Sequence, residues 1–167
     1  MDAGLELAAY AAVQNLKAAG LTTATAESCT GGLIAALLTG VPGASQAFRY
    51  GWVTYCNEAK ERQLNVPHDV LEQYSAVSEP VVRSMAENAR QLADADLAVA
   101  VSGNAGPTKG APNEPEVGTV CIALARKGQP THTETIFQPN LSRSAFRNLV
   151  ANRALALLAQ ARRIGQL

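Results

Sequence analysis

The fold is set by residues 21–32, whose sequence is Leu-Thr-Thr-Ala-Thr-Ala-Glu-Ser-Cys-Thr-Gly-Gly. Residues 21–26 are rich in Thr and alternate apolar with polar side chains, a pattern that predicts a β-strand. Residues 31–40 follow with Leu33, Ala36 and Leu37 at helical spacing, which predicts a helix. The turn at residues 27–32 is therefore expected between the carboxyl end of a strand and the start of a helix.

Helices and strands alternate along the rest of the chain. The apolar spacing predicts further helices over 3–19, over 57–64 with Asn57 as its cap, from Ser78 and from Ser142. Apolar and β-branched runs predict strands at 48–55, 97–101, 118–126 and 131–137, with a loop rich in Gly and Pro at 103–118. We predict an α/β fold over residues 1–167, a single layered domain with a mixed β-sheet flanked by helices.

Length, composition and charge exclude several classes of protein. The chain has 167 residues, 47% hydrophobic and 17% charged, which is enough to bury a core without disulfides or metals. Lys plus Arg number 14, as do Asp plus Glu, and the formal net charge of zero argues against a nucleic-acid partner. We see no signal peptide and no apolar run near the roughly 20 residues that span a bilayer. We expect neither a nucleic-acid nor a membrane partner, and a homo-oligomer stays open.

The cysteines and histidines do not form a recognisable metal site. Cys29, Cys56 and Cys121 are far apart and form no CxxC pair, which favours a reduced, cytoplasmic location. His68, expected in a loop, and His132, expected in a strand, lie too far apart to support a histidine triad or a zinc site. We therefore predict a protein without a bound metal.

The turn at residues 27–32 is the first candidate for chemistry. A Ser28 hydroxyl at this point lies near free backbone N–H groups and the positive end of a helix dipole, which can hold a phosphate or stabilise an oxyanion. Gly31 and Gly32 allow a ligand to approach the backbone closely. The alternative is that Ser28 or Thr30 simply caps the helix.

The second candidate is the segment from Tyr55 to Lys60. Lys60 is expected in the first turn of a helix, where the dipole disfavours a cation and lowers the pKa of a lysine. A neutral lysine can act as a general base, although Glu58 and Glu61 would raise the pKa. The alternative is a core tyrosine beside a solvated lysine.

Two further segments could bind a ligand. Small residues at 102–106 follow a predicted buried strand, as in the ligand crevices of α/β sheets, although a tight turn explains them equally well. Arg143 lies at the start of the last predicted helix, where an anion could meet a guanidinium and free N–H groups. Its alternative is an ordinary surface arginine.

Together with shorter motifs, these segments resemble the CinA C-terminal domain family, whose members include nicotinamide mononucleotide deamidases. The matching segments occur in the family's order and cover nearly the whole chain: 26–32, 41–45, 55–60, 76–79, 103–107 and 117–120. Many members carry a further N-terminal domain, and we expect this chain to be a stand-alone form.

The resemblance implies an amidohydrolase of pyridine nucleotide salvage. It would convert nicotinamide mononucleotide to nicotinic acid mononucleotide and ammonia, with no metal and no organic cofactor. The family's catalytic positions fall on Ser28 as nucleophile and on Tyr55 and Lys60 as its activating pair. We expect substrate contacts from Cys29, Thr30, Gly31, Gly32, Asn57, Gly103, Asn104, Ala105, Gly106 and Arg143.

The chain departs from the family's pattern after the strand at 97–101. The family usually has Thr-Gly-Ile-Ala-Gly-Pro where this chain has Ser102 and Asn104 in place of Thr and Ile, and it often has glycines where this chain has Thr108 and Lys109. These changes leave a catalytically weak or inactive nucleotide-binding module as an alternative. A third interpretation is a hydrolase that uses the Cys29 thiolate.

Overall fold

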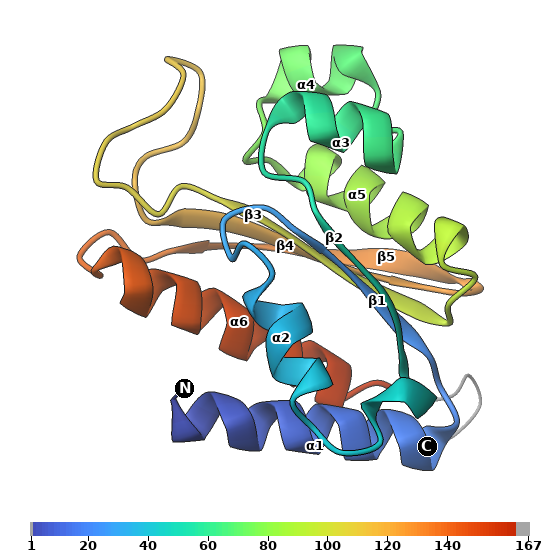
Figure 1. Cartoon of the computed structure of the whole chain (residues 1–167). Helices are drawn as coiled ribbons and strands as arrows, with labels where there is room; N and C mark the ends of the chain where they lie inside the picture. The colour runs from blue at the N-terminus through green and yellow to red at the C-terminus, as the bar shows by residue number, and fades with distance from the viewer. Residues whose placement is uncertain (1, 163–167) are drawn as a thin grey trace.

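A computed structural model describes residues 2–162, which form one layered α/β domain (Figure 1). Within this part of the chain, five strands build one sheet in the order β2-β1-β3-β4-β5. The strands are β1 (Thr23–Glu27), β2 (Phe48–Val53), β3 (Leu97–Gly103), β4 (Thr119–Arg126) and β5 (Gln129–Phe137). β1 pairs in parallel with β2 and β3, whereas β4 is antiparallel to both β3 and β5, so the predicted mixed sheet is confirmed.

Helices cover both faces of the sheet (Figure 1). One layer contains α1 (Ala3–Ala19), α2 (Leu33–Thr39) and α6 (Arg143–Ala159); the other contains α3 (Asn57–Leu64), α4 (His68–Tyr74) and α5 (Glu79–Leu92). A short 3-10 turn, η1 (Ala44–Gln46), precedes β2. The central strands β1 and β3 are buried on both sides, and the helices that cover them meet the sheet through apolar side chains.

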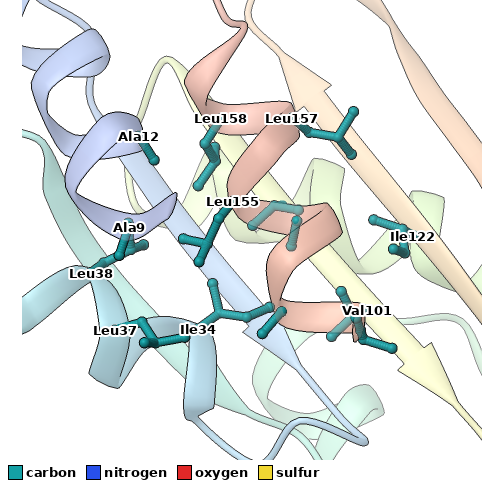
Figure 2. Packing of buried hydrophobic residues seen from close by; sticks show 14 of the residues in the cluster. Ala9, Ala12, Ile34, Leu37, Leu38, Val101, Ile122, Leu155, Leu157 and Leu158 are labelled. Carbon is teal, nitrogen blue, oxygen red and sulfur yellow. The ribbon is translucent and has the colours of Figure 1, made fainter. Parts of the chain in front are cut away.

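Strand β3 shows why the two layers differ. Leu97, Val99 and Val101 face the core under α1, α2 and α6, where Ile34, Leu155 and their neighbours pack together (Figure 2). The alternating residues Ala98 and Ala100 face the other core, which includes much of the buried stripe of α5. Because strand residues alternate between faces, the small alanines let α5 lie close to the sheet while the larger side chains fill the opposite layer.

The boundaries differ from the sequence predictions in several places. Gly31 and Gly32 have φ of +60° and +92°, which no α-helix contains, so α2 begins at Leu33. Cys56 rather than Asn57 occupies the N-cap of α3. His68 opens the unpredicted helix α4 instead of lying in a loop. The Ser78 cap of α5 is confirmed, since its hydroxyl accepts a hydrogen bond from the Val81 N–H.

Candidate active site

The Glu27 carboxylate organises the turn between β1 and α2. It accepts hydrogen bonds from the Thr30 hydroxyl at 2.6 Å and from the N–H groups of Gly32, Ile34 and Ala35 at 3.1, 3.0 and 2.8 Å. The side chain is 1% exposed, so its negative charge lies buried at the positive end of the α2 dipole. The predictions of a cap from Ser28 or Thr30, and of an open helix N-terminus for an anion, are therefore wrong.

This turn holds Ser28 at the carboxyl end of β1. The Ser28 N–H donates to the Val101 carbonyl at 3.1 Å, and its own carbonyl accepts from the Gly31 N–H at 3.0 Å. The hydroxyl lies 3.5 Å from the Tyr55 carbonyl oxygen and 3.1 Å from Lys60 Nζ. Ser28 is thus fixed by the backbone on both sides, and its hydroxyl points at a lysine.

Lys60 Nζ lies within hydrogen-bond distance of three oxygens. These are the Thr54 carbonyl at 2.8 Å, Ser28 Oγ at 3.1 Å and the Tyr55 carbonyl at 3.3 Å, and the residue is only 1% exposed. An ammonium would donate one N–H to each oxygen. A neutral amine has two N–H groups for the two carbonyls, which leaves its lone pair facing the Ser28 hydroxyl.

Burial lowers the pKa of Lys60 from 10.5 to about 8. Three nearby side chains raise the pKa and so partly offset the effect of burial; the largest contribution comes from Cys56, followed by Cys29 and Glu114. The lowered pKa predicted from the sequence is thereby supported, but desolvation is its main cause rather than the helix dipole. Nor are Glu58 and Glu61 the groups that raise it.

The alternative of a core tyrosine beside a solvated lysine is wrong, because Tyr55 is exposed and Lys60 is buried. Tyr55 is 58% exposed, and its hydroxyl accepts a hydrogen bond from Arg143 at 2.9 Å. Only the carbonyl of Tyr55 is in hydrogen-bond contact with Ser28 and Lys60. A second guanidinium nitrogen of Arg143 donates to the Gly106 carbonyl at 2.5 Å, so this arginine joins α6 to the segments at 55 and 106.

These groups line a cavity of about 350 Å³ at the carboxyl ends of β1 and β3. Of the residues predicted from the sequence, it brings together Ser28, Cys29, Tyr55, Asn57, Lys60, Gly103, Asn104, Ala105, Gly106 and Arg143. Thr30, Gly31 and Gly32 do not line it, because they form the Glu27-bound turn behind Ser28. The predicted contacts left out Cys56, Ala76, Val77, Ser102, Thr108, Gly110 and Glu114; of these, Cys56, Ala76 and Val77 lie in motifs shared with the family, and Ser102 lies in the candidate segment 102–106.

The Asn104 side chain is engaged in the loop that follows β3. Its Oδ1 accepts from the Gly106 N–H at 3.0 Å, and its Nδ2 donates to the Pro115 carbonyl at 3.4 Å. Ser102 keeps a hydroxyl where the family usually has threonine, and that hydroxyl donates to the Ala76 carbonyl at 2.7 Å. Ser102 and Asn104 are therefore hydrogen-bonded within the cavity wall, and Ser28 and Lys60 remain in contact.

The Cys29 thiol is poorly suited to be the nucleophile. Its side chain is buried, and burial raises its pKa to about 12, so the reactive thiolate is scarce at neutral pH.

Among residues 2–162, no cluster of three or more His, Cys, Asp or Glu side chains is arranged to hold a metal ion. In the same part of the chain, no helix combines the length and apolar character needed to cross a membrane.

The fold and the cavity define an α/β domain that presents a serine and a buried lysine at the carboxyl ends of its parallel strands. Residues 6–162 match the family model of the CinA C-terminal domain. A CinA-like protein of Akkermansia muciniphila is 56% identical over 154 residues, 92% of this chain and 36% of that protein. The chain belongs to the CinA C-terminal domain family.

Solved structures of relatives have the same fold. The competence/damage inducible protein CihA from Agrobacterium tumefaciens superposes with a TM-score of 0.89 at 35% identity, covering 95% of both chains. A CinA superfamily protein from Escherichia coli gives 0.88 at 37% identity, covering 96% of this chain and 93% of that one. The chain spans about a third of the length of the curated relatives it matches, and their names state no reaction.

Replacing Glu27 with glutamine should destabilise the domain. The amide retains one acceptor oxygen but introduces an NH₂ group among four donors, and we expect a loss of about 1–3 kcal/mol in the free energy of unfolding. Urea unfolding measures the change. Glu58→Gln is the matched control, because among residues 2–162 the Glu58 side chain forms only an exposed ion pair with Arg62. Equal stability of the two variants would contradict the role assigned to Glu27.

Lys60→Met should stabilise the domain most at neutral pH. The pKa of Lys60 is lower in the folded than in the unfolded chain, so the unfolded chain binds more protons between about pH 8 and 10.5. Wild-type stability should therefore rise across this window relative to Lys60→Met, by on the order of 1–3 kcal/mol. Chemical unfolding at both ends of the window tests this, with Lys127→Met on an exposed turn as control. A constant difference between wild type and Lys60→Met would rule out the buried, easily deprotonated amine.

Proposed function

We propose that this chain hydrolyses the carboxamide of nicotinamide mononucleotide to nicotinic acid mononucleotide and ammonia. The observation that carries the proposal is the 3.1 Å contact between Ser28 Oγ and the buried Lys60 Nζ. Membership of the CinA C-terminal domain family supports this substrate, because the resemblance found in the sequence is to a family that includes such deamidases. The reaction needs no metal or organic cofactor, and the partner is this small molecule rather than a nucleic acid or a membrane. We place it in the cytoplasm, consistent with free Cys29, Cys56 and Cys121.

In the first step the Ser28 hydroxyl attacks the carboxamide carbon. A serine hydroxyl is a weak nucleophile at neutral pH unless a base accepts its proton. The lone pair of neutral Lys60 Nζ accepts that proton as the Oγ–carbon bond forms, and the carbonyl π electrons move to the oxygen. Lys60 does this by direct contact, without a relay through the Tyr55 hydroxyl, which is bonded to Arg143.

The oxyanion that forms needs a preorganised donor. The Gly31 and Gly32 N–H groups are already bonded to the Ser28 carbonyl and the Glu27 carboxylate. Within residues 2–162, the N–H of Cys29, the residue that follows the nucleophile and lines the cavity, donates to no oxygen and contacts only its own side-chain sulfur. We assign the Cys29 N–H as an oxyanion donor.

In the second step the Lys60 ammonium returns its proton to the amide nitrogen. The carbon–nitrogen bond breaks, ammonia leaves, and the nicotinoyl group remains on Ser28 as an ester. Neutral Lys60 then accepts a proton from water as the water oxygen attacks the ester carbon. The carbon–Oγ bond breaks, Ser28 Oγ regains a proton from Lys60, and the carboxylic acid product leaves and gives its remaining proton to solvent as the carboxylate. The Arg143 guanidinium at the cavity supplies a positive charge for the substrate phosphate.

The purified chain should release ammonia from nicotinamide mononucleotide, and EDTA should not reduce the rate. A coupled ammonia assay measures the reaction, and chromatography identifies nicotinic acid mononucleotide as the second product. Tight binding of the nucleotide without turnover would instead support the inactive nucleotide-binding module. Strong inhibition by EDTA would exclude the metal-free reaction.

Ser28→Ala should lower kcat by at least about a thousandfold, because it removes the covalent step. Cys29→Ala should stay within about tenfold of wild type, since its backbone N–H remains in place. Both rates come from the same ammonia assay, with circular dichroism to confirm folding. The reverse order of effects would identify Cys29 as the nucleophile and refute the assignment of Ser28.

A further inference from the structure

A single carboxylate lines the cavity beside Ser28. Among the described lining residues, the charged side chains are Lys60, Arg143 and Glu114. Glu114 comes from residues 104–118, the long loop that joins β3 to β4 and extends beyond the end of the sheet (Figure 1). It is half-buried, and neither the fold nor the catalytic steps derived above use its carboxylate.

The Glu114 carboxylate is free to interact with a ligand. Within residues 2–162, it takes part in no hydrogen bond or ion pair, whereas Glu116 on the same loop pairs with Lys109 at 3.0 Å. The carboxylate lies directly against Gly110, where an added Cβ would collide with Glu114 Oε2. A side chain at position 110 would displace the end of the Glu114 side chain from its present place.

The cavity is therefore dipolar. The Arg143 guanidinium supplies a positive charge, and the Glu114 carboxylate supplies a negative charge that is felt at Lys60. In a half-buried site such charges act on a ligand more strongly than they would in water. A ligand that fits this arrangement carries an anionic group and, near the carboxamide that Ser28 attacks, a cationic ring.

We propose that Glu114 is a specificity-determining residue that selects carboxamides on a cationic, pyridinium-type ring over the same carboxamides on a neutral ring. The inference rests on the proposed hydrolysis of nicotinamide mononucleotide, whose oxidised ring is a pyridinium. The reduced, dihydropyridine form of that nucleotide has the same ribose, phosphate and carboxamide but lacks the ring charge. Glu114 thus favours binding of the oxidised form over the reduced form.

A variant that binds the nucleotide but cannot hydrolyse it allows binding to be measured apart from catalysis. In the Ser28→Ala chain, calorimetry gives the Kd for oxidised and for reduced nicotinamide mononucleotide. Adding Glu114→Gln should weaken binding of the oxidised form by about tenfold and leave the reduced form within about twofold. Glu114→Asp keeps the charge and should retain the preference. Glu116→Gln on the same loop is the matched control and should change neither Kd.

Equal weakening of both forms by Glu114→Gln, or no weakening of either, overturns the assignment of Glu114. If the intact chain still releases ammonia from nicotinamide mononucleotide in that case, the proposed function stands and only the role of Glu114 fails. If the intact chain neither binds nor hydrolyses the nucleotide, the proposed function fails and the role of Glu114 fails with it. Circular dichroism and the Glu114→Asp variant exclude misfolding as the cause of a lost preference.

Discussion

A buried carboxylate at the start of α2 is the constraint on which the site depends. Glu27 binds the Thr30 hydroxyl and three helix N–H groups, so the chain leaves β1, turns through two glycines with positive φ and enters the helix in one geometry. Ser28 lies inside this turn, with its backbone hydrogen-bonded on both sides and its hydroxyl 3.1 Å from Lys60 Nζ. The same bonds occupy the N–H groups of Gly32, Ile34 and Ala35, so the oxyanion donor that we propose is the N–H of Cys29.

The second requirement is the burial of Lys60, which opposes stability. The α3 helix carries it beneath the surface, where two backbone carbonyls and the Ser28 hydroxyl are its hydrogen-bond partners. A charged amine is costly in such a place, and that cost is what lowers its pKa toward neutrality. The domain tolerates this because the large apolar cores on both sides of the sheet supply its stability. Under the proposed function, the burial that makes a charged Lys60 costly is also what makes its amine available as a base.

Much of this arrangement could be predicted from the sequence, for reasons that are physical. The helical spacing in α1, α5 and α6 and the apolar run of β3 correctly predicted a mixed sheet between helices. The motifs correctly placed Ser28 and Lys60 in one site. Local patterns could not show that Lys60 is buried and Tyr55 exposed, since both depend on packing between distant segments. The roles of Glu27 and Glu114 were missed because a single acidic residue at the end of a strand or in a loop has no distinctive sequence pattern. Helix α4 was missed because seven residues are too few to show a helical period.

The central claim is that burial lowers the pKa of Lys60 to about 8, so that a neutral fraction of its amine is available to accept the Ser28 proton. The most direct measurement is an NMR titration of selectively labelled lysine side chains in the intact chain, with Lys60→Met used to assign the Lys60 signal. The account predicts that this signal titrates near pH 8, in keeping with the burial of its amine. A Lys60 signal that titrates near the ordinary value of 10.5 would contradict the account, because the lysine would then be charged and unable to accept the Ser28 proton.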